Sequence, residues 1–591
     1  MAIEIKRLFD FLYFQLESNP IPNSLNTKYD GKWVSVSSQE FVNSVNQMSR
    51  GLLNLGVEQG DKIALISSTN RTEWNILDMA IMQLGAINVP IYPTIGENDY
   101  KYIFNHAEVK FCFLSDEKLY EKAKLAQKDS PKLLEIFTFD QVENAKNWKE
   151  IFHLGKDLTR QEEVDKLKAQ VKAEDLATII YTSGTTGTPK GVMLTHNNIV
   201  TNVIDSTPRL PITTGSGVVM SFLPVCHIFE RMLHYLYIHN SLAIYFAESI
   251  EKISDNLKEV KPHFMSVVPR LLEKIYDSIV AKGADLPGIK KMIFFWAIDV
   301  GMAYEPYAQK SWWYEKKLNL ARKLIFSKWK EALGGRLHTM VSGSAPLQPR
   351  LTRIFCAADL QVMEGYGLTE TSPVVSVNQY TGENFRIGTV GKLINRVEVK
   401  IAEDGEILVK GPNVMIGYYK DPEKTAEVMT GDFFHTGDKG EIDSDGFLKI
   451  TGRKKEIFKT SGGKYIAPAP IENQMKQSRF IEQILVIGEG QKMAAALIQP
   501  NFEFVKEWAK RHHIEIGNSI LEIAQNSKVK ERIMEEVDKG NEQFGKWETI
   551  KRIELTPDIW TVDNNLLTPT FKPKRTEILK KYKDLYDKIY S

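Results

Sequence analysis

The chain has 591 residues, more than one ordinary hydrophobic core accommodates, and its length indicates about two to four domains. Hydrophobic residues make up 43% and charged residues 26%, as in soluble globular proteins, and the net charge of +1 argues against a nucleic-acid-binding protein that relies on bulk electrostatic attraction. Three widely spaced cysteines, Cys112, Cys226 and Cys356, exclude a disulfide framework or a structural zinc site and suit a reducing cytoplasm.

The sequence predicts no membrane-spanning segment. No apolar run approaches the roughly 20 residues that a spanning helix needs, and the first residues lack the basic-then-apolar pattern of a secretory signal. Any membrane contact is therefore expected to be peripheral. The best candidate is 290–330, where lysines alternate with aromatic residues as in segments that lie at anionic interfaces. The alternative is a solvated helical insertion whose aromatic side chains lie in the core.

Predicted helices and strands alternate through the first part of the chain. Phe41, Val45, Met48 and Leu52 recur at helical spacing, and Gly56 is placed to end that helix. Helices are expected at 39–56, 72–85 and 98–107, with strands at 62–67, 87–91 and 110–114. This alternation predicts βα units around a parallel sheet and an α/β fold.

A glycine- and threonine-rich loop follows the apolar strand-like run 176–180. It spans Tyr181 to Val192, contains glycines that free the backbone, and has Lys190 near its end. Flexible backbone N–H groups, hydroxyl donors and a mobile positive charge together favour binding of a polyphosphate. A Walker P-loop is excluded because Pro189 and Gly191 replace its second glycine and its magnesium-binding hydroxyl residue.

The composition changes near residue 400. Before it, a strand at 218–222, a helix at 228–238 and a strand at 242–246 continue the alternation. After it, Val397–Val409 and Gly437–Gly452 read as short strands joined by tight turns. Strands at 484–487 and 494–497 and three helical runs up to residue 543 then form a smaller α+β unit. We therefore expect a large domain over 1–453 and a small one over 454–591.

Three further strings carry candidate chemistry. In the first, residues 364–371, Tyr366 lies between two glycines and could stack on a purine, and Glu370 is a hard oxygen ligand suited to Mg²⁺. In the second, Asp438 could accept ribose hydroxyls and Arg453 offers a rigid fork of donors. In the third, prolines stiffen a loop that displays Lys572 and Lys574, which could neutralise charge as pyrophosphate leaves.

These strings, in this order, resemble the ANL superfamily of adenylating enzymes, and most closely its long-chain fatty acid–CoA ligases. The resemblance covers nearly the whole chain and includes the strings at 223–231, 268–272, 341–347 and 567–570. It implies a large domain of β-sheets layered with helices, with a distorted β-barrel, and a small mobile α+β domain. The pairing of His-Ile-Phe-Glu-Arg at 227–231 with Leu-Thr-Pro-Thr at 567–570 points to long-chain acids.

The resemblance also implies roles for individual residues. The phosphate loop would include Thr182, Ser183, Gly184, Thr185, Thr186, Gly187 and Lys190. The adenosine site would include Gly343, Ser344, Ala345, Glu364, Gly365, Tyr366, Gly367 and Thr369, with Asp438 and Arg453 on the ribose. Mg²⁺ would be bound by Glu370 and Thr185.

Four more assignments concern catalysis and movement. Lys574 aligns with the adenylation lysine, and Lys572 remains the alternative because Pro573 stands where many relatives have a glycine. His227 would line the acyl–adenylate junction. Lys455 would be the hinge, and Gly462 and Gly463 would face the coenzyme A channel. Some long-chain relatives have a tryptophan four residues after this histidine that gates the acyl tunnel. The present chain has Arg231 at that position, so we do not expect this gate.

The implied reaction has two steps and uses ATP, Mg²⁺ and coenzyme A. A fatty acid carboxylate attacks the α-phosphate to give acyl-AMP and pyrophosphate, and the coenzyme A thiol then displaces AMP. Cys226 is read as a pocket or core residue, since no covalent nucleophile is needed. A fatty acyl-AMP ligase that loads a carrier protein, and an inactive acyl- or nucleotide-binding protein tethered at membranes, remain the alternatives. We expect a cytoplasmic location with contact, if any, at the inner membrane surface, and no nucleic-acid partner; a monomer and a homodimer both stay open.

Overall fold

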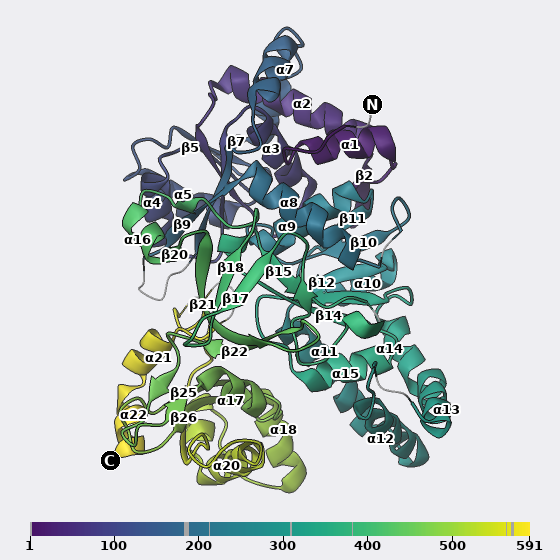
Figure 1. Ribbon diagram of the computed structural model, residues 1–591, viewed down its shortest axis with the longest axis vertical. Helices are drawn as coiled ribbons and strands as arrows, with labels where there is room; N and C mark the ends of the chain where they lie inside the picture. The colour runs from purple at the N-terminus through teal and green to yellow at the C-terminus, as the bar shows by residue number, and fades with distance from the viewer. Residues whose placement is uncertain are drawn as a thin grey trace. The chain divides into compact units, whose positions relative to one another are not determined.

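The computed structural model describes residues 3–182, 188–211, 213–307, 310–380, 382–562, 564–568 and 572–591 (Figure 1). The chain forms two compact units. Unit 1 comprises 1–399, 409–435 and 444–448, and unit 2 comprises 400–408, 436–443 and 449–591. Because these units do not follow a single cut of the chain, the domain border expected between 453 and 454 stays a prediction.

Unit 1 contains an eight-stranded sheet with the order β19-β9-β8-β4-β3-β5-β6-β7. Its strands β8, β4, β3, β5, β6 and β7 are parallel, and β9 and β19 are antiparallel additions at one edge. The strands are β3 (Lys62–Ile66), β4 (Ile87–Ile91), β5 (Val109–Leu114), β6 (Glu135–Thr138), β7 (Lys146–Asn147), β8 (Leu176–Thr182), β9 (Lys190–Thr195) and β19 (Gly417–Tyr418).

A nine-stranded sheet with the order β16-β15-β14-β13-β12-β10-β11-β1-β2 completes the framework of unit 1. Six strands, β14 to β1 in that order, are parallel to their neighbours. The strands are β1 (Leu25–Tyr29), β2 (Lys32–Val36), β10 (Val218–Ser221), β11 (Ala243–Phe246), β12 (Phe264–Val267), β13 (Thr339–Ser342), β14 (Gln361–Gly367), β15 (Val374–Val377) and β16 (Lys392–Leu393).

Helices cover both faces of the two sheets, because buried parallel strands are apolar on both sides. On β3, Ile63 and Leu65 belong to the core between the sheets, whereas Ala64 and Ile66 face the outer core beside α4 and α5. The inner helices are α1 (Asp10–Ser18), α2 (Ser38–Leu55), α3 (Thr72–Gln83), α6 (Trp148–Leu154), α8 (His196–Ser206) and α9 (Ile228–His239); α7 (Gln161–Gln170) lies beside α2. Two outer helices are α4 (Glu97–His106) and α5 (Glu117–Gln127).

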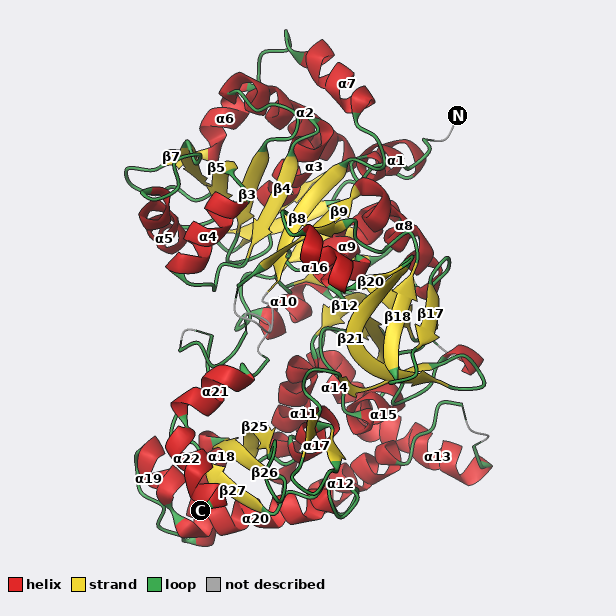
Figure 2. Cartoon of the chain, turned by 60° about the vertical axis from the view of Figure 1, so that its left-hand side comes forward, coloured by secondary structure: helices red, strands yellow, loops and turns green. Residues whose placement is uncertain are grey.

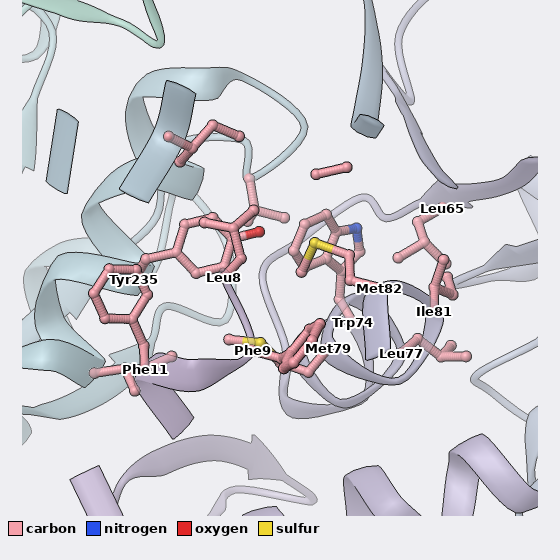
Figure 3. Packing of buried hydrophobic residues seen from close by; sticks show 14 of the residues in the cluster. Leu8, Phe9, Phe11, Leu65, Trp74, Leu77, Met79, Ile81, Met82 and Tyr235 are labelled. Carbon is pink, nitrogen blue, oxygen red and sulfur yellow. The ribbon is translucent and has the colours of Figure 1, made fainter. Parts of the chain in front are cut away.

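The inner core of unit 1 is built from large apolar side chains of distant segments. Figure 3 shows Trp74, Met79 and Met82 of α3 near Phe9 and Tyr235. These side chains are at most 1% exposed, so each contributes about 1.5–3 kcal/mol of burial free energy. This core holds α3 and α9 together and thereby fixes His227, the residue immediately before α9.

The outer face of the nine-stranded sheet carries a second set of helices. They are α10 (Ile253–Val260), α11 (Pro269–Ala284), α12 (Gly288–Met302), α13 (Trp312–Ala321), α14 (Ser327–Ala332) and α15 (Pro349–Ala357), with a π-helical segment at Arg322–Phe326. Figures 1 and 2 show α12 and α13 at the end of unit 1 opposite α2 and α7. Among the described residues, none of the helices is both long and apolar enough to cross a bilayer.

The remaining strands form three smaller sheets. A five-stranded sheet contains β17 (Glu398–Ile401), β18 (Glu406–Lys410), β20 (Met429–Thr430), β21 (Phe433–Ile442) and β22 (Leu448–Arg453), and α16 (Pro422–Glu427) precedes β20. Unit 2 has the sheet β25 (Ile481–Ile487), β26 (Ala495–Pro500) and β27 (Arg552–Leu555), and the hairpin β23 (Phe458–Lys459) and β24 (Tyr465–Ile466). Its helices are α17 (Pro468–Met475), α18 (Phe502–His512), α19 (Ile520–Gln525), α20 (Ser527–Asn541), α21 (Arg575–Lys581) and α22 (Lys583–Tyr590).

The predicted α/β architecture and alternating elements are confirmed. The helix expected at 39–56 is α2, which begins with a Ser37 capping box and ends at Gly56 with φ +90°. Such left-handed residues favour glycine, because it has no Cβ to clash with the following carbonyl. The strands expected around the turns at 403–406 and 443–446 are present as β17, β18, β21 and β22.

Candidate active site

The glycine- and threonine-rich segment joins two antiparallel strands of the eight-stranded sheet, as the sequence predicts. Thr182 at the end of β8 pairs with Lys190 at the start of β9. Ser183, Gly184, Thr185, Thr186 and Gly187 lie outside the described residues. Gly191 is required next to the loop, because a Cβ there would come within 2.8 Å of the Ile179 side chain. The loop therefore starts and ends on paired strands that hold Lys190 in place.

Tyr418 connects the loop lysine with the candidate magnesium ligand. The ammonium of Lys190 lies 5.1 Å from the centre of the Tyr418 ring, and the Tyr418 hydroxyl donates to Oε1 of Glu370 over 2.9 Å. Pairing of β19 with β9 brings Tyr418 opposite Val192. Burial, followed by the nearby Glu370 charge, raises the pKa of Tyr418, so its hydroxyl keeps the proton that it donates.

Glu370 is also fixed through its backbone. Its carbonyl accepts a hydrogen bond of 2.8 Å from the amide of Met415, in the segment that leads to β19. Its half-buried carboxylate is the kind of oxygen ligand that Mg²⁺ takes together with phosphate oxygens. No cluster of three or more His, Cys, Asp or Glu side chains suited to a metal occurs in the described part of the chain. A single carboxylate linked through Tyr418 to Lys190 fits a metal that binds together with phosphate oxygens.

The strings at 343–345 and 364–369 meet at the carboxyl ends of two parallel strands. Ser342, the last residue of β13, pairs with Glu364 in β14, so Gly343, Ser344 and Ala345 leave the sheet beside Gly365 and Tyr366. The carboxyl edge of a parallel sheet is where α/β proteins bind ligands. Tyr366 is half-buried, and Thr369 opens the short 3₁₀ turn that contains Glu370.

Backbone geometry explains why this edge uses small residues. A Cβ on Gly367 would come within 1.8 Å of the Pro373 carbonyl oxygen, so only glycine fits. Ser344 has a φ of +69°, a conformation that few residues other than glycine adopt. The buried Glu364 accepts a hydrogen bond from the Leu347 amide over 3.1 Å, and burial raises its pKa to about 8. Glu364 thus holds the 343–347 turn against β14 rather than presenting a free carboxylate.

His227 is the N-cap residue of α9 and has a defined tautomer when neutral. Its Nδ1 accepts the Phe229 amide hydrogen over 3.2 Å, so Nε2 carries the proton. The Tyr92 ring lies edge-on to its imidazole at 6.4 Å. The Phe229 ring lies 3.4 Å from the position of a Cβ on Gly343, so this histidine turn and the 343–345 turn are neighbours.

Glu230 fixes the start of α9 to the nine-stranded sheet. Its two carboxyl oxygens accept hydrogen bonds of 2.6 Å from the hydroxyls of Ser221 on β10 and Ser266 just beyond the middle of β12. Burial raises the pKa of Glu230 to about 7. Cys226 is also buried and the pKa of its thiol is raised, which matches its reading as a core or pocket residue.

Arg231 occupies the position at which some long-chain relatives have a gating tryptophan. Its side chain is fully buried. Its guanidinium donates to Oδ1 of Asp78 over 2.6 Å and to the hydroxyls of Tyr235 and Thr178. Asn88 donates to the same Asp78 oxygen over 2.6 Å. These contacts tie α9, α3, β4 and β8 into one buried polar network, so Arg231 has a structural role.

Replacing Asp78 with asparagine is expected to lower the stability of unit 1 strongly. The change leaves the buried Arg231 charge without its carboxylate, which costs about 3–5 kcal/mol. Denaturant unfolding followed by tryptophan fluorescence measures the loss. Asp432→Asn is the control, because its pair with Lys410 is exposed and is worth at most about 1 kcal/mol. Equal stability of both variants would contradict the role given to the buried pair.

Asp438 and Arg453 are brought together within unit 2. Nε of Arg453 donates to Oδ1 of Asp438 over 2.9 Å. The Asp438 side chain is only 11% exposed, and its amide bonds to the Thr436 hydroxyl. In the neighbouring turn, Lys454 pairs with Glu406 and Asp404. The predicted ribose pair is thus a preformed contact between β21 and β22.

The two candidate lysines have different surroundings. Lys572 as a whole is exposed to solvent, but its ammonium is not fully solvated. This loss of solvent lowers the pKa of Lys572, and the positive charge of Arg453 lowers it further. Asp438 and Glu456 act on the same ammonium in the opposite direction. Lys574 instead donates to the Asn565 side chain and directly precedes α21. The Asp438–Arg453 pair is therefore among the charges that influence the pKa of Lys572.

Lys455 and the two glycines lie in exposed turns. Lys455 is in the turn after β22, which is closed by hydrogen bonds from the Glu456 and Ile457 amides to the Arg453 carbonyl. Gly462 and Gly463 form the tip of the β23–β24 hairpin, where Gly463 has a φ of +79°. Sequence reasoning missed Tyr418, although its Gly417-Tyr418-Tyr419 string could have drawn attention as a glycine next to two aromatic residues.

Comparison with known proteins identifies the family. The AMP-binding enzyme model matches residues 20–419, and the model of the AMP-binding enzyme C-terminal domain matches residues 455–591. The chain belongs to the AMP-binding enzymes. This finding confirms the predicted resemblance to the adenylating ANL superfamily and the expectation of an enzyme.

Relatives and folds agree with this assignment. The long-chain-fatty-acid–CoA ligase FadD15 of Mycobacterium tuberculosis is 33% identical over 567 residues, covering 95% of this chain and 93% of the relative. The peroxisomal long chain acyl-CoA synthetase 7 of Arabidopsis thaliana is 34% identical and covers 95% of this chain and 82% of the relative. The A domain of a carboxylic acid reductase from Segniliparus rugosus, solved with AMP, has a TM-score of 0.73 at 22% identity, with 99% and 94% of the two chains covered. That structure shows the shared fold.

Proposed function

We propose that this AMP-binding enzyme activates long-chain fatty acids to acyl-CoA with ATP, through an acyl-AMP intermediate. The observation that carries the proposal is the joint presence of the phosphate-loop strands, the Glu370–Tyr418 contact and the Asp438–Arg453 pair. The names of the similar ligases support long-chain acids as substrates. AMP, pyrophosphate and the acyl-CoA thioester are the products.

In the first step, the acid's carboxylate oxygen bonds to the α-phosphorus of ATP and the bond to pyrophosphate breaks. Lys190 and the loop would hold the β- and γ-phosphates, Tyr366 would stack on adenine, and Asp438 would accept from the ribose hydroxyls. When bound, Mg²⁺ would be held by Glu370 and phosphate oxygens and would neutralise charge on the departing pyrophosphate. Positioning and charge neutralisation then account for the rate, without a covalent enzyme intermediate.

We assign the adenylation lysine to Lys572 rather than Lys574. The assignment rests on the charges around Lys572, which include both members of the proposed ribose pair. The Asp438 carboxylate, proposed to bind the ribose hydroxyls, acts on the Lys572 ammonium. A lysine in this position is well placed to reach the α-phosphate region, where negative charge develops. Lys574 is instead engaged with Asn565.

In the second step, the coenzyme A thiol releases its proton, its sulfur bonds to the acyl carbon, and AMP leaves. His227 would line the junction between acyl group and adenylate, and Gly462 and Gly463 would face the incoming thiol. Lys455 would act as the hinge between the steps, because the departing pyrophosphate and the incoming thiol need different access. Exclusion of water protects the acyl-AMP from hydrolysis.

Replacing Tyr418 with phenylalanine is expected to raise the KM for Mg·ATP. The change removes the hydrogen bond to Glu370 but keeps the ring next to Lys190, so about 1 kcal/mol, or about fivefold, is expected. Steady-state kinetics at varied Mg²⁺ measures it. Tyr419→Phe is the control, since the Tyr419 ring packs on His106. An unchanged Mg²⁺ dependence in Tyr418→Phe would remove Tyr418 from the metal-binding arrangement.

AMP release with and without free coenzyme A tests the proposal against its alternatives. A coenzyme A–fatty acid ligase releases AMP continuously only when both the acid and coenzyme A are present. Accumulation of acyl-AMP without turnover by coenzyme A would favour a fatty acyl-AMP ligase that loads a carrier protein. Absence of AMP release with any acid would favour an inactive binding protein. A cytoplasmic location and peripheral contact at the inner membrane surface remain part of the proposal.

A further inference from the structure

The segment from α12 through α13 to the π-helical residues after it displays an unusual concentration of exposed apolar side chains. Among the described residues, 21 large apolar side chains are exposed, and seven of them lie within the 36 residues from Ile289 to Leu324. These seven are Ile289, Met292, Tyr307, Trp312, Trp313, Leu320 and Leu324. Scattered exposed apolar residues are ordinary, but such a local concentration marks an interaction surface.

The apolar residues of α13 occupy two different sides of the helix. Leu318 and Ala321 are buried in the core of unit 1, and the Tyr314 hydroxyl donates to the Val300 carbonyl of α12 over 2.8 Å. Trp313 and Leu320 are seven residues apart and therefore lie on one side, where they are 71% and 48% exposed. The buried side already anchors α13, so the exposed side is not needed for folding of the helix.

Positive charges accompany the exposed apolar side chains. From Gly288 to Leu333 the chain has nine Lys or Arg and four Asp or Glu, whereas the whole chain has 76 and 75. Lys316 and Lys317 lie between Trp313 and Leu320 along α13, and the Lys316 ammonium is 5.3 Å from the Trp312 ring centre. In the described part of the chain, neither these two lysines nor Lys323 forms an ion pair with an acid, while Glu315 is the single acid on α13.

We infer that the exposed face of α13, with the adjoining start of α12, docks on an anionic lipid bilayer. Tryptophan and leucine side chains insert at the boundary between headgroups and acyl chains, and lysines beside them attract anionic headgroups. A purely acidic protein partner would explain the lysines but not paired tryptophans that are 59% and 71% exposed. This inference rests on the proposed peripheral membrane contact and specifies the surface that makes it. The surface would hold the enzyme at the bilayer into which long-chain acids partition.

Cosedimentation of the full chain with vesicles tests the surface. Phosphatidylglycerol/phosphatidylcholine vesicles are expected to bind the protein, phosphatidylcholine vesicles to bind it weakly, and added salt to weaken binding. Trp313→Asp/Leu320→Asp should lower the apparent affinity for anionic vesicles by about tenfold or more. The matched control is Leu154→Asp/Leu158→Asp, which changes two leucines that are 49% and 67% exposed elsewhere in unit 1.

A second variant tests the charge contribution separately. Lys316→Gln/Lys317→Gln/Lys323→Gln should lower binding to anionic vesicles by about tenfold or more, and Lys118→Gln/Lys156→Gln/Lys166→Gln, at other exposed lysines, should not. All variants should keep wild-type AMP release with a dilute, dissolved long-chain acid in the absence of vesicles, which shows that they fold. Equal binding of wild type to neutral and anionic vesicles, or wild-type binding by the α13 variants, would overturn the inference. Binding to polyglutamate but not to vesicles would also overturn the membrane-docking inference, in favour of an acidic protein partner. Absence of AMP release by the wild type would count against the ligase function alone.

Discussion

Lys572→Ala is expected to reduce acid-dependent ATP–pyrophosphate exchange by about a hundredfold or more, the usual effect of removing a group that stabilises developing negative charge. The exchange reaction reports the first step alone. Thioester formation from supplied acyl-AMP should change little in this variant, because no pyrophosphate has to leave. Lys574→Ala is the matched control, since it removes a lysine two residues away that contacts Asn565.

The pH dependence gives a second readout of Lys572. Its pKa is lowered, chiefly by loss of solvent around the ammonium, so the charge is lost at a pH below that of an ordinary lysine. If the first step needs the charged form, exchange falls as the pH rises through this lowered pKa. Lys572→Arg keeps its charge at high pH and should remove that fall, whereas Lys574→Arg should leave it in place. Loss of exchange in Lys574→Ala with normal exchange in Lys572→Ala would reverse the assignment.

Lys455→Pro is expected to slow thioester formation by about tenfold or more while affecting exchange much less. Proline fixes φ and restricts the residue before it, so the turn closed by the Glu456 and Ile457 amides loses the freedom that a hinge needs. Single-turnover assays of the two steps measure the effect.

Lys455→Ala is the control for the hinge, because it removes the side chain and keeps the backbone free. This variant should retain both steps if the backbone at this position is what matters. An equal loss of exchange and thioester formation in Lys455→Pro would contradict alternation between two conformations.

The fold was largely predictable because its signals are local. Hydrophobic residues at helical spacing, Gly56 after α2 and the strand–loop–strand pattern around Lys190 all depend on a few neighbouring residues. The presence of the site strings was predictable for the same reason. The strings 343–345 and 364–369 meet at the edge of β13 and β14 because these two parallel strands are neighbours. The sequence alone does not determine that strand order.

The residues that sequence reasoning missed depend on contacts between distant segments. Tyr418 reaches Glu370 and Lys190 because β19 pairs with β9, more than 200 residues earlier in the chain. Arg231 was noted only as a departure from a tryptophan, and its partner Asp78 lies 153 residues away. The choice between Lys572 and Lys574 likewise needed the charges that surround them, since both lysines stand in the same proline-containing loop.

The sequence left two interpretations of the aromatic residues in 290–330, an interfacial segment and a helical insertion with aromatic side chains in the core. The structure contains aromatic residues of both kinds, exposed and buried. Phe294, Phe326 and Trp329 are buried in the core of unit 1, whereas Trp312 and Trp313 are exposed. Composition could not separate these groups, because burial depends on which side of each helix faces the neighbouring elements.

Identification of the thioester product is the direct test of long-chain fatty acid activation by this enzyme. The purified protein is given ATP, Mg²⁺, coenzyme A and an equimolar mixture of acids from acetate to long-chain fatty acids, and the products are measured by mass spectrometry. Activation of long-chain acids predicts AMP and long-chain acyl-CoA thioesters, formed in equal amounts and dependent on ATP. Formation of only short-chain or aromatic thioesters, or of acyl-AMP with no thioester, would contradict it.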